Sequence, residues 1–337
     1  MSQVVTLIPG DWVGGEVAAV VRRLLAAAGA DIDWEVVECG ERTYRTRGES
    51  LPDEALESIR RNKVCLKGRL FVPPEPNKLP PTIRLRQGLD LFASIRPIRN
   101  VWELPARHPT LDLLLVREST EDVYAGREHM VVPGVVETLK VTTTRGSERI
   151  ALTAFTLARQ LGRKKVTTVH KANIMKMADG LWLETSRRVA QNFPDIEHND
   201  IIVDNLAMQL VSRPQKFDVL LLGNLFGDII ADLCTGLVGG ICQVPSIARG
   251  EGDIVVYEAP HGRAPELVGK DLANPLILLT PALSLLRDMG KEDVATRLMN
   301  ATLATLRAGI KTPDLGGTAH LSEFESAILS RLARAQA

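Results

Sequence analysis

The stretch DVLLLGNLFGDIIADL, residues 218–233, says most about how this chain folds. Residues 218–222 form an apolar run of the length of a buried strand, and a helical run follows from Asn224. Within that run Asp228 and Asp232 are four residues apart, so both carboxylates project from one face of the helix. A buried strand that leads into a helix predicts one unit of an α/β fold.

The same alternation of strand and helix continues on both sides of this stretch. Further strands are expected at residues 4–8, 33–37, 64–68, 111–116, 166–170 and 201–204. Helices are expected at residues 16–28, from Leu51 onward, at 151–165, at 276–290 and in the tail from Lys291. Residues 72–81 are a proline-rich loop, and LDLFASI (89–95) is strand-like. The alternation predicts a mainly parallel sheet.

Length and composition narrow the class of protein. At 337 residues the chain exceeds one ordinary core, and it has no flexible linker or repeat, so we expect two closely joined domains that are discontinuous in sequence. With 45% hydrophobic and 24% charged residues it is globular in composition. A formal net charge of zero argues against a general nucleic-acid or acidic-membrane binder.

Cysteine usage and the apolar runs predict a cytoplasmic enzyme. The N-terminal stretch starts a strand directly, without a basic and then apolar leader, and no apolar run reaches about 18 residues. The cysteines lack metal-site spacing, and we interpret them as buried free thiols in a reducing compartment: Cys39, Cys65, Cys234 and Cys242.

The two aspartates of the helical run are candidate metal ligands. Carboxylate oxygens suit Mg²⁺ or Mn²⁺, whose octahedron substrate oxygens and water would complete. The alternative is a solvated acidic face, but the neighbours of Asp228 and Asp232 are Leu, Ile, Ala and Gly, which make a poor solvent face. Asp204 lies at a predicted strand-to-helix junction and, taken alone, is better explained as a helix N-cap.

Three arginines are candidates for binding an anionic substrate. Arg86 and Arg96 flank the strand-like 89–95 segment, and Arg117 ends the apolar run LLLV. Guanidinium groups at strand ends can converge on carboxylates and bind them through two parallel hydrogen bonds. The alternative is ordinary surface charge, because the chain has 41 Lys and Arg residues.

Tyr124 and Lys171 are candidate acid–base groups. Tyr124 lies seven residues after Arg117, and Lys171 follows the predicted strand VTTVH. A lysine at the carboxyl end of a strand faces the crevice where α/β sheets bind ligands, and a metal and cations nearby can lower its pKa. The alternatives are a packed aromatic side chain and a surface lysine.

The loop YEAPHGRAPELVGKDLANP, residues 257–275, is a candidate cofactor site. Backbone amides of such a loop can hold phosphates, and the chain contains no G-x-G-x-x-G fingerprint. Glu266 could accept a hydrogen bond from a ribose 2′-hydroxyl, as in NAD, and would repel a 2′-phosphate. His261 on its own is more often a structural residue.

Taken together, these stretches resemble the β-decarboxylating dehydrogenases, that is, the isocitrate, homoisocitrate and 3-isopropylmalate dehydrogenases, and the middle of the chain looks most like NAD-dependent isocitrate dehydrogenases. The resemblance runs from TLIPGDWVGGEV to DLGGTAHLSEFESAI, and its most specific parts are VHKANIMKMADGLWLE, NLFGDIIADLCTGLVGG and HGRAPELVGKDLANP. It implies two α/β domains with mixed parallel sheets and a cleft between them. Residues 1–98 with 249–337 would form the large cofactor-binding domain. Residues 99–248 would form a small domain with the dimer interface and a β-arm at about 124–146.

The resemblance also implies roles for individual residues. Catalysis would fall to Tyr124 and Lys171, and the metal would be held by Asp228 and Asp232 with Asp204 of a neighbouring subunit, which also lends Lys171. The active unit would therefore be a homodimer. The substrate would be bound by Arg86, Arg96, Arg117, Lys67, Thr82 and Asn173. NAD would be bound by His261, Gly262, Ala264, Pro265, Glu266, Leu267 and Asn274.

Several positions depart from the pattern of the family. Pro80 replaces a serine that binds a third carboxylate in isocitrate enzymes, and Thr82 replaces an asparagine. Bulky Trp12 lies near the entrance of the expected cofactor site. Ser119 replaces an asparagine. Extra cations occur at Arg69, Arg84 and Arg127.

The leading hypothesis is an NAD-dependent and Mg²⁺- or Mn²⁺-dependent oxidative decarboxylation of an isocitrate-like 2-hydroxy acid. Homoisocitrate, 3-isopropylmalate and an analogue with a more anionic arm, such as a phosphonate, remain alternative substrates. A non-catalytic regulatory subunit is the alternative from another class of function.

Overall fold

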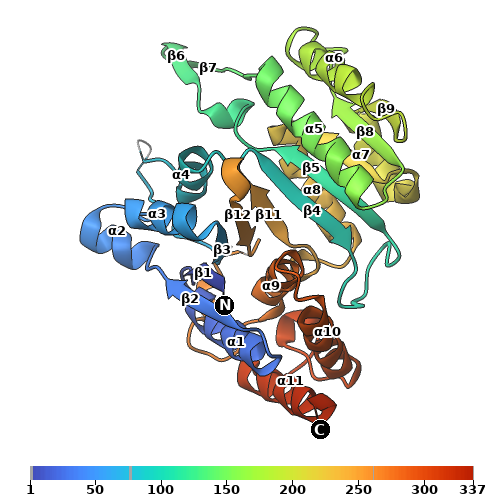
Figure 1. Cartoon of the computed structure of the whole chain (residues 1–337). Coiled ribbons are helices and arrows are strands. Elements are labelled where there is room, and N and C mark those ends of the chain that lie inside the picture. The colour runs from blue at the N-terminus through green and yellow to red at the C-terminus, as the bar shows by residue number, and fades with distance from the viewer. Residues whose placement is uncertain (1–2, 76–77, 261, 337) are drawn as a thin grey trace.

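The computed structural model describes residues 3–75, 78–260 and 262–336. A ten-stranded sheet runs through these residues in the order β2-β1-β3-β12-β11-β4-β5-β10-β8-β9, and β6 and β7 form a separate hairpin (Figure 1). The strands are β1 (Gln3–Ile8), β2 (Ile32–Val36), β3 (Val64–Lys67), β4 (Ala93–Arg99), β5 (Asp112–Glu118), β6 (Glu128–Val132), β7 (Val135–Thr138), β8 (Lys165–His170), β9 (Glu197–Ile202), β10 (Val219–Leu222), β11 (Ser246–Arg249) and β12 (Val255–Glu258).

Helices cover both faces of the sheet. They are α1 (Gly14–Ala27), α2 (Glu41–Arg47), α3 (Asp53–Asn62), α4 (Pro81–Gly88), α5 (Thr144–Gln160), α6 (Ala178–Ala190), α7 (Val203–Ser212), α8 (Asn224–Leu237), α9 (Leu276–Asp288), α10 (Glu292–Arg307) and α11 (Leu321–Gln336). Among the described residues, no helix has the length and apolar character needed to cross a membrane.

The predicted mainly parallel sheet is confirmed. β11 pairs antiparallel with β12 and β4, and β4 pairs antiparallel with β5, whereas the remaining neighbours in the sheet pair parallel. The strands β5, β10, β8 and β9 therefore bring their carboxyl ends to one edge of the sheet, which is where ligands bind in open α/β sheets.

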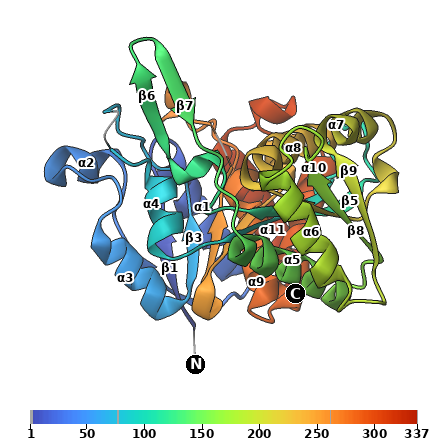
Figure 2. The ribbon, with the colours of Figure 1, turned by 90° about the horizontal axis from the view of Figure 1, so that it is seen from above.

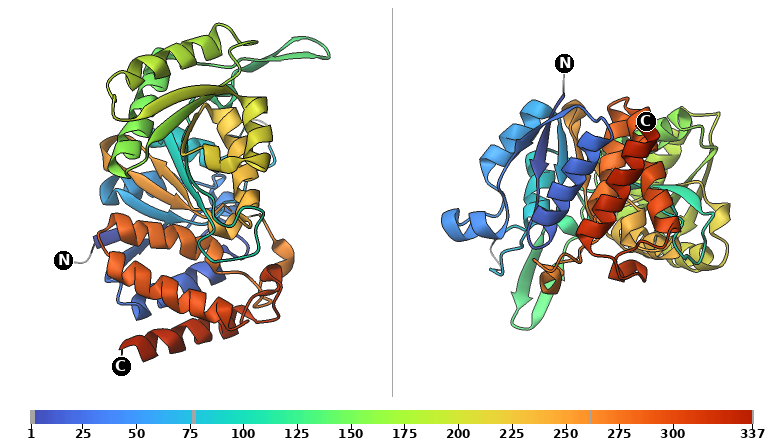
Figure 3. Two further views of the ribbon diagram at one scale, coloured as in Figure 1. Left: turned by 90° about the vertical axis from the view of Figure 1, so that its right-hand side faces the viewer. Right: turned by 90° about the horizontal axis from the view of Figure 1, so that it is seen from below.

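Segments from the two ends of the chain lie together in one half of the molecule, and the middle segment lies in the other half (Figures 1 and 3). The sheet order groups the strands in the same way, since β1–β4, β11 and β12 are on one side and β5, β8, β9 and β10 on the other. The predicted boundaries of the two domains, at residues 98 and 249, stay a prediction.

Alternating side chains of β5 serve two hydrophobic layers, as expected for a strand covered on both faces. Leu114 and Val116 pack in the layer that contains α5 and α6, whereas Leu113 and Leu115 pack in the layer that contains α7 and α8. The start of α8 is thereby held on one face of the sheet, directly after β10.

The hairpin β6–β7 projects from the body of the molecule (Figure 2), within the range predicted for a β-arm. Every residue of both strands is exposed. The exposed side chains include a run of large apolar ones, namely Met130, Val131, Val132, Val135, Val136 and, just beyond, Leu139. An isolated two-stranded hairpin with this much exposed apolar surface is typical of a contact with another chain.

Three elements differ clearly from the sequence prediction, and one of them is the strand expected at 201–204, which is β9 at Glu197–Ile202 because α7 already begins at Val203. The 89–95 segment is not a continuous strand, because β4 begins only at Ala93 and the preceding residues form a turn in which the Leu91 N–H donates to the carbonyl of Arg86 (2.9 Å). The helix predicted at 151–165 spans 144–160 instead. It begins where Thr143 accepts a hydrogen bond from the Gly146 N–H (3.0 Å), and it ends before Gly162, which has a φ of 67°.

The cysteine prediction is confirmed for three of the four residues. Cys65, Cys234 and Cys242 are buried free thiols, whereas Cys39 is only partly buried. Cys39 lies just after β2 at the outer edge of the sheet, where fewer neighbours cover it.

Candidate active site

Arg117 is the buried centre of the site. It lies near the carboxyl end of β5, with only 1% of its surface exposed, and pairs in register with Leu222 of β10. Its Nε and Nη2 donate to Oδ1 of Asn224 (3.0 and 2.6 Å), and its Nη1 donates to Oδ1 of Asp228. The guanidinium group is thus directed along the first turns of α8.

A glycine in α8 makes this arrangement possible. A Cβ atom at Gly227 would lie 2.6 Å from Cγ of Arg117, closer than real Cβ atoms approach other atoms. The sequence NLFGD therefore combines an amide ligand for Arg117, a gap for its aliphatic stem and a carboxylate for its charge.

Tyr124 binds the other carboxylate oxygen of Asp228, and its ring lies next to Arg117. It belongs to the short 3-10 helix Val123–Ala125, and its hydroxyl donates to Oδ2 of Asp228 (2.6 Å). Burial, and next the hydrogen bond to Asp228, raise the pKa of Tyr124, so the phenol keeps its proton. Burial alone would raise the pKa of Asp228, but Arg117 and Tyr124 outweigh it and lower that pKa, so the carboxylate keeps its charge.

Two further arginines extend the positive charge. Nη1 of Arg96, in β4, donates to Oδ1 of Asp232 (3.2 Å). Arg86 lies in the last turn of α4 and not at a strand end, which corrects the sequence-based placement. Burial, followed by repulsion from Arg86, lowers the pKa of Arg117, and Arg96 acts in the same direction. The Nε atoms of Arg86 and Arg96 are buried and have no hydrogen-bond partner among the described residues.

Sequence reasoning missed Glu258, which is buried at the end of β12. Its Oε1 lies 3.3 Å from Nζ of Lys67, and both side chains are almost fully enclosed. Burial would raise the pKa of Glu258, but Lys67 and then Arg86 lower it further than burial raises it, so the carboxylate stays charged. A carboxylate that directly follows the apolar run IVVY was the available signal.

Lys171 and Asp204 form a second, separate pair. Lys171 follows β8, Asp204 lies in the first turn of α7, and the Nζ of Lys171 donates to Oδ1 of Asp204. Asp204 is not the N-cap of α7, since Ile202 occupies that position. Within the described part of the chain, no three His, Cys, Asp or Glu side chains come close enough to hold a metal ion. Within one copy of the chain, Asp204 therefore lies apart from Asp228 and Asp232.

Comparisons with known proteins identify the family of the chain. The family model described as isocitrate/isopropylmalate dehydrogenase matches residues 4–328. The chain is 42% identical over 328 residues to the mitochondrial NAD isocitrate dehydrogenase catalytic subunit 5 of Arabidopsis thaliana, covering 97% of this chain and 88% of the relative. It is 44% identical over 309 residues to the chloroplastic 3-isopropylmalate dehydrogenase of Solanum tuberosum, covering 92% and 86%. The chain belongs to the isocitrate/isopropylmalate dehydrogenase family.

Solved structures support the same assignment. The crystal structure of isocitrate dehydrogenase from Methylococcus capsulatus matches with a TM-score of 0.91 at 39% identity, covering 98% of this chain and 99% of that one. The chain is therefore a dehydrogenase with the fold of this family, as the resemblance implied.

The middle of the candidate cofactor loop of this dehydrogenase, residues 262–270, is mostly exposed. Glu266 lies on its surface in the short 3-10 helix Pro265–Leu267, and Leu267 packs against the core. Gly262 is exposed, and Ala264 has a left-handed φ of 44°. Asn274 is buried and engaged within the chain, because its amide donates to Oδ2 of Asp314 (2.8 Å) and accepts from the Leu276 N–H (2.9 Å). His261 lies outside the described residues.

The departures from the family pattern have different environments. The guanidinium of Arg263 lies 5.9 Å from the centre of the Trp12 ring, so Trp12 is next to the candidate cofactor loop. Pro80 is the N-cap of α4, and Thr82 lies in its first turn. Arg84 donates to Glu49 (2.7 Å) and Asp53 (2.9 Å), so its charge is neutralised by partners on the surface. Arg127, at the root of the hairpin, and Asn173, after Lys171, are both exposed.

Proposed function

We propose that this dehydrogenase oxidises an isocitrate-like 2-hydroxy acid with NAD and removes its β-carboxyl group as CO₂, with Mg²⁺ or Mn²⁺. The observation that carries the proposal is the arrangement Arg117–Asp228–Tyr124, in which buried Arg117 holds the partly exposed Asp228 and Tyr124 donates to it, bordered by Arg86 and Arg96. Fixed cations suit a polycarboxylate, and a protonated phenol beside them suits a proton donor.

The arginines bind and orient the acid. Arg86 and Arg96 border Arg117 and would hold carboxylates of the substrate, and Arg117 supplies positive charge at the bottom of the site. Substrate carboxylates held this way would place the hydroxyl carbon against the nicotinamide, so that the hydride leaves in one direction while the hydroxyl proton leaves in another.

The proton is handled at two positions. The Nζ of Lys171 of the partner subunit would take the hydroxyl proton as hydride passes to NAD. After the carbon–carbon bond to the β-carboxyl breaks, the Tyr124 hydroxyl would protonate the carbon that carried it. The phenol is suited to this step because its raised pKa keeps the proton in place until a stronger base forms next to it.

Asp228 and Asp232 supply hard oxygen donors on one face of α8, which fits half of an octahedral divalent-metal site. Asp204 of the partner subunit would complete the protein's share of the ligands. A bound Mg²⁺ or Mn²⁺ would polarise the oxygen of the substrate's hydroxyl carbon and spread the charge that develops there.

A homodimer is the assembly that joins the two halves. In one copy the pair Lys171–Asp204 and the cluster around Asp228 do not contact each other, so each half needs the complementary half of a second copy. The exposed apolar side chains of the hairpin β6–β7 provide a surface for that contact. NAD, not NADP, is expected because the exposed carboxylate of Glu266 would repel a 2′-phosphate.

The test is a panel of 2-hydroxy acids that differ only in the variable arm of the substrate. Each acid is incubated with the purified protein, Mn²⁺ and NAD or NADP, and the absorbance of the reduced cofactor is followed. We expect isocitrate with NAD to be the best pair. The cations at Arg86, Arg96 and Arg117 suit a carboxylate arm better than the apolar arm of 3-isopropylmalate.

Two results of the panel would change the proposal. A faster reaction with a phosphonate-bearing acid would favour the specialised analogue, although Arg84 does not contribute to such a site because it pairs with Glu49 and Asp53. No reduction of NAD or NADP by any acid, alone or with a second chain, would contradict the proposal and favour a regulatory subunit.

A further inference from the structure

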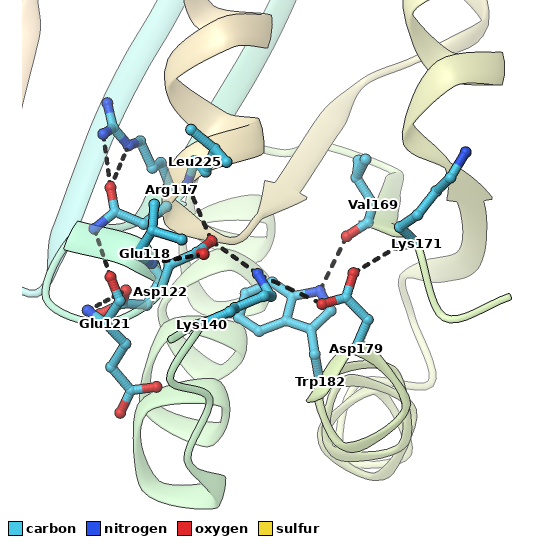
Figure 4. Close-up of polar contacts among 12 residues, drawn as sticks. Arg117, Glu118, Glu121, Asp122, Lys140, Val169, Lys171, Asp179, Trp182 and Leu225 are labelled. Atoms are coloured by element: carbon cyan, nitrogen blue, oxygen red, sulfur yellow. Dashed lines mark hydrogen bonds and ion pairs between the residues drawn. The ribbon is translucent and has the colours of Figure 1, made fainter. Parts of the chain in front are cut away.

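Lys140 lies between the two halves of the site and contacts neither a substrate-binding arginine nor a candidate metal ligand. It follows the hairpin β6–β7, and only 18% of its side chain is exposed. Its Nζ lies 2.8 Å from Oδ2 of Asp122 and 3.5 Å from Oδ1 of Asp179 (Figure 4). Both carboxylates are buried, with side-chain exposures of 4% and 5%.

Asp122 organises the half of the site that contains Tyr124. It has a left-handed φ of 68°, and its Oδ1 accepts from the Val123 N–H (2.8 Å) at the start of the turn that carries Tyr124. Its Oδ2 accepts from the Leu225 N–H (3.1 Å) in the first turn of α8. One carboxylate therefore fixes the turn of Tyr124 relative to the helix of Asp228.

Asp179 organises the other half. Its Oδ2 accepts from the backbone N–H of Lys171 (2.6 Å), directly after β8. Figure 4 shows Arg117 on one side of this network and Lys171 on the other. Lys140 also lies 5.3 Å from the centre of the Phe226 ring, which belongs to the first turn of α8.

The charges of the network make Lys140 necessary. Two enclosed carboxylates share one ammonium group, and without it they would be left as buried like charges held only by backbone N–H groups. Each carboxylate could then be hydrated or turn away, and it would release the backbone N–H that it holds.

We propose that Lys140 is a positioning residue that fixes two groups at once, namely the Tyr124–Asp228 cluster of its own site and the Lys171 that the same chain lends to the partner's site. The second part rests on the proposed function. Because the network lies at the root of the hairpin β6–β7, the contact between subunits and the geometry of both sites depend on the same buried ammonium.

The test is hydrogen–deuterium exchange by mass spectrometry, with fragmentation that resolves the amides of Lys171 and Leu225, combined with kinetics of the full-length protein. In Lys140→Gln both amides should exchange faster. The kcat should fall by about 10–100-fold while KM for the acid changes little, since the arginines are not in the network. Lys140→Arg, which keeps the charge, should restore part of kcat and slow the exchange again.

Arg163→Gln is the matched control. Arg163 also bridges two aspartates, Asp112 and Asp218 (2.9 Å to the latter), but at the amino ends of β5 and β10. We expect it to leave both amides and kcat as in the wild type. Equal effects of Lys140→Gln and Arg163→Gln, or unchanged exchange in Lys140→Gln, would overturn the proposal.

A second variant keeps the proposal testable if Lys140→Gln does not fold. Asp179→Asn preserves the size of the side chain and should speed exchange at Lys171 only, with Leu225 still protected by Asp122. Unchanged exchange at Lys171 would contradict the proposal. Exchange requires no turnover, so a protein that oxidises no acid but shows this pattern would refute the proposed function and leave the positioning role intact.

Discussion

Arg117 can lie along α8 because residue 227 has no side chain. A methyl group there would overlap the aliphatic stem of Arg117. Because Asn224 and Asp228 hold the guanidinium, neither α8 nor the Arg117 side chain can move without breaking those hydrogen bonds. We predict that Gly227→Ala lowers the free energy of unfolding by about 1–3 kcal/mol and raises KM for the acid. Denaturant unfolding and steady-state kinetics would check this. Gly236→Ala is the control, because nothing lies within 4 Å of a Cβ at that position of the same helix.

Tyr124 is the residue whose role depends most on its proton. Tyr124→Phe removes the hydroxyl that donates to Asp228 but keeps the ring against Arg117. The variant should have a kcat lower by about 10²–10⁴-fold, with a much smaller change in KM. An unchanged kcat would show that the phenol is not the proton donor.

The candidate residues differ in how far the sequence alone could place them. The i and i+4 spacing of Asp228 and Asp232 placed both on α8, and Arg117 was correctly put at the end of its strand. Arg86 was placed wrongly because Pro81, interpreted as part of a loop, is in fact the first residue of α4, a position that proline favours. Glu258 was missed because its importance comes from Lys67, which is far away in the sequence.

The secondary-structure elements also differ in how well the sequence alone predicts them. Long periodic segments such as α1, α8 and α9 were predicted close to their observed bounds. The four-residue strands β11 and β12 were not, since so few residues carry no recognisable period. The charged α2 was missed for the related reason that only Thr43 among its residues is buried.

The edge strand β9 carries a group that should make stability depend on pH. His198 donates to or accepts from the Thr168 hydroxyl (2.9 Å) and packs edge-on against Phe155. Burial lowers the pKa of His198, with Asp200 acting in the opposite direction and Arg187 in the same one. Between the two pKa values the unfolded chain therefore binds a proton that folded His198 does not. The stability that neutral His198 contributes is complete above about pH 6.5, and it is lost as the pH falls through the lowered pKa of the folded state.

His198→Gln tests this reasoning. The variant keeps a hydrogen-bonding side chain but cannot titrate, so its stability should fall less than that of the wild type between about pH 6.5 and 5. Urea unfolding of both proteins across that range would measure the difference. Parallel curves would contradict the assignment.

At the scale of the whole molecule, one chain carries the Arg117–Asp228–Tyr124 cluster and the separate Lys171–Asp204 pair. The alternation of strands and helices and the family motifs were sufficient to predict the fold, whereas the sharing of a site between two copies stays a proposal. A single sequence could not reveal the network through Lys140, because Asp122, Lys140 and Asp179 become neighbours only when β5, β8 and the hairpin come together.

The most direct test of the account is complementation between two inactive variants. Asp228→Asn and Lys171→Met each remove an essential group, so each protein alone should be nearly inactive. If sites are shared between copies, a mixed dimer has one site with Asp228 from one chain and Lys171 from the other. An equal, randomly assembled mixture should then recover about a quarter of the wild-type rate. A mixture no more active than its components, although mixed dimers have formed, would contradict the account.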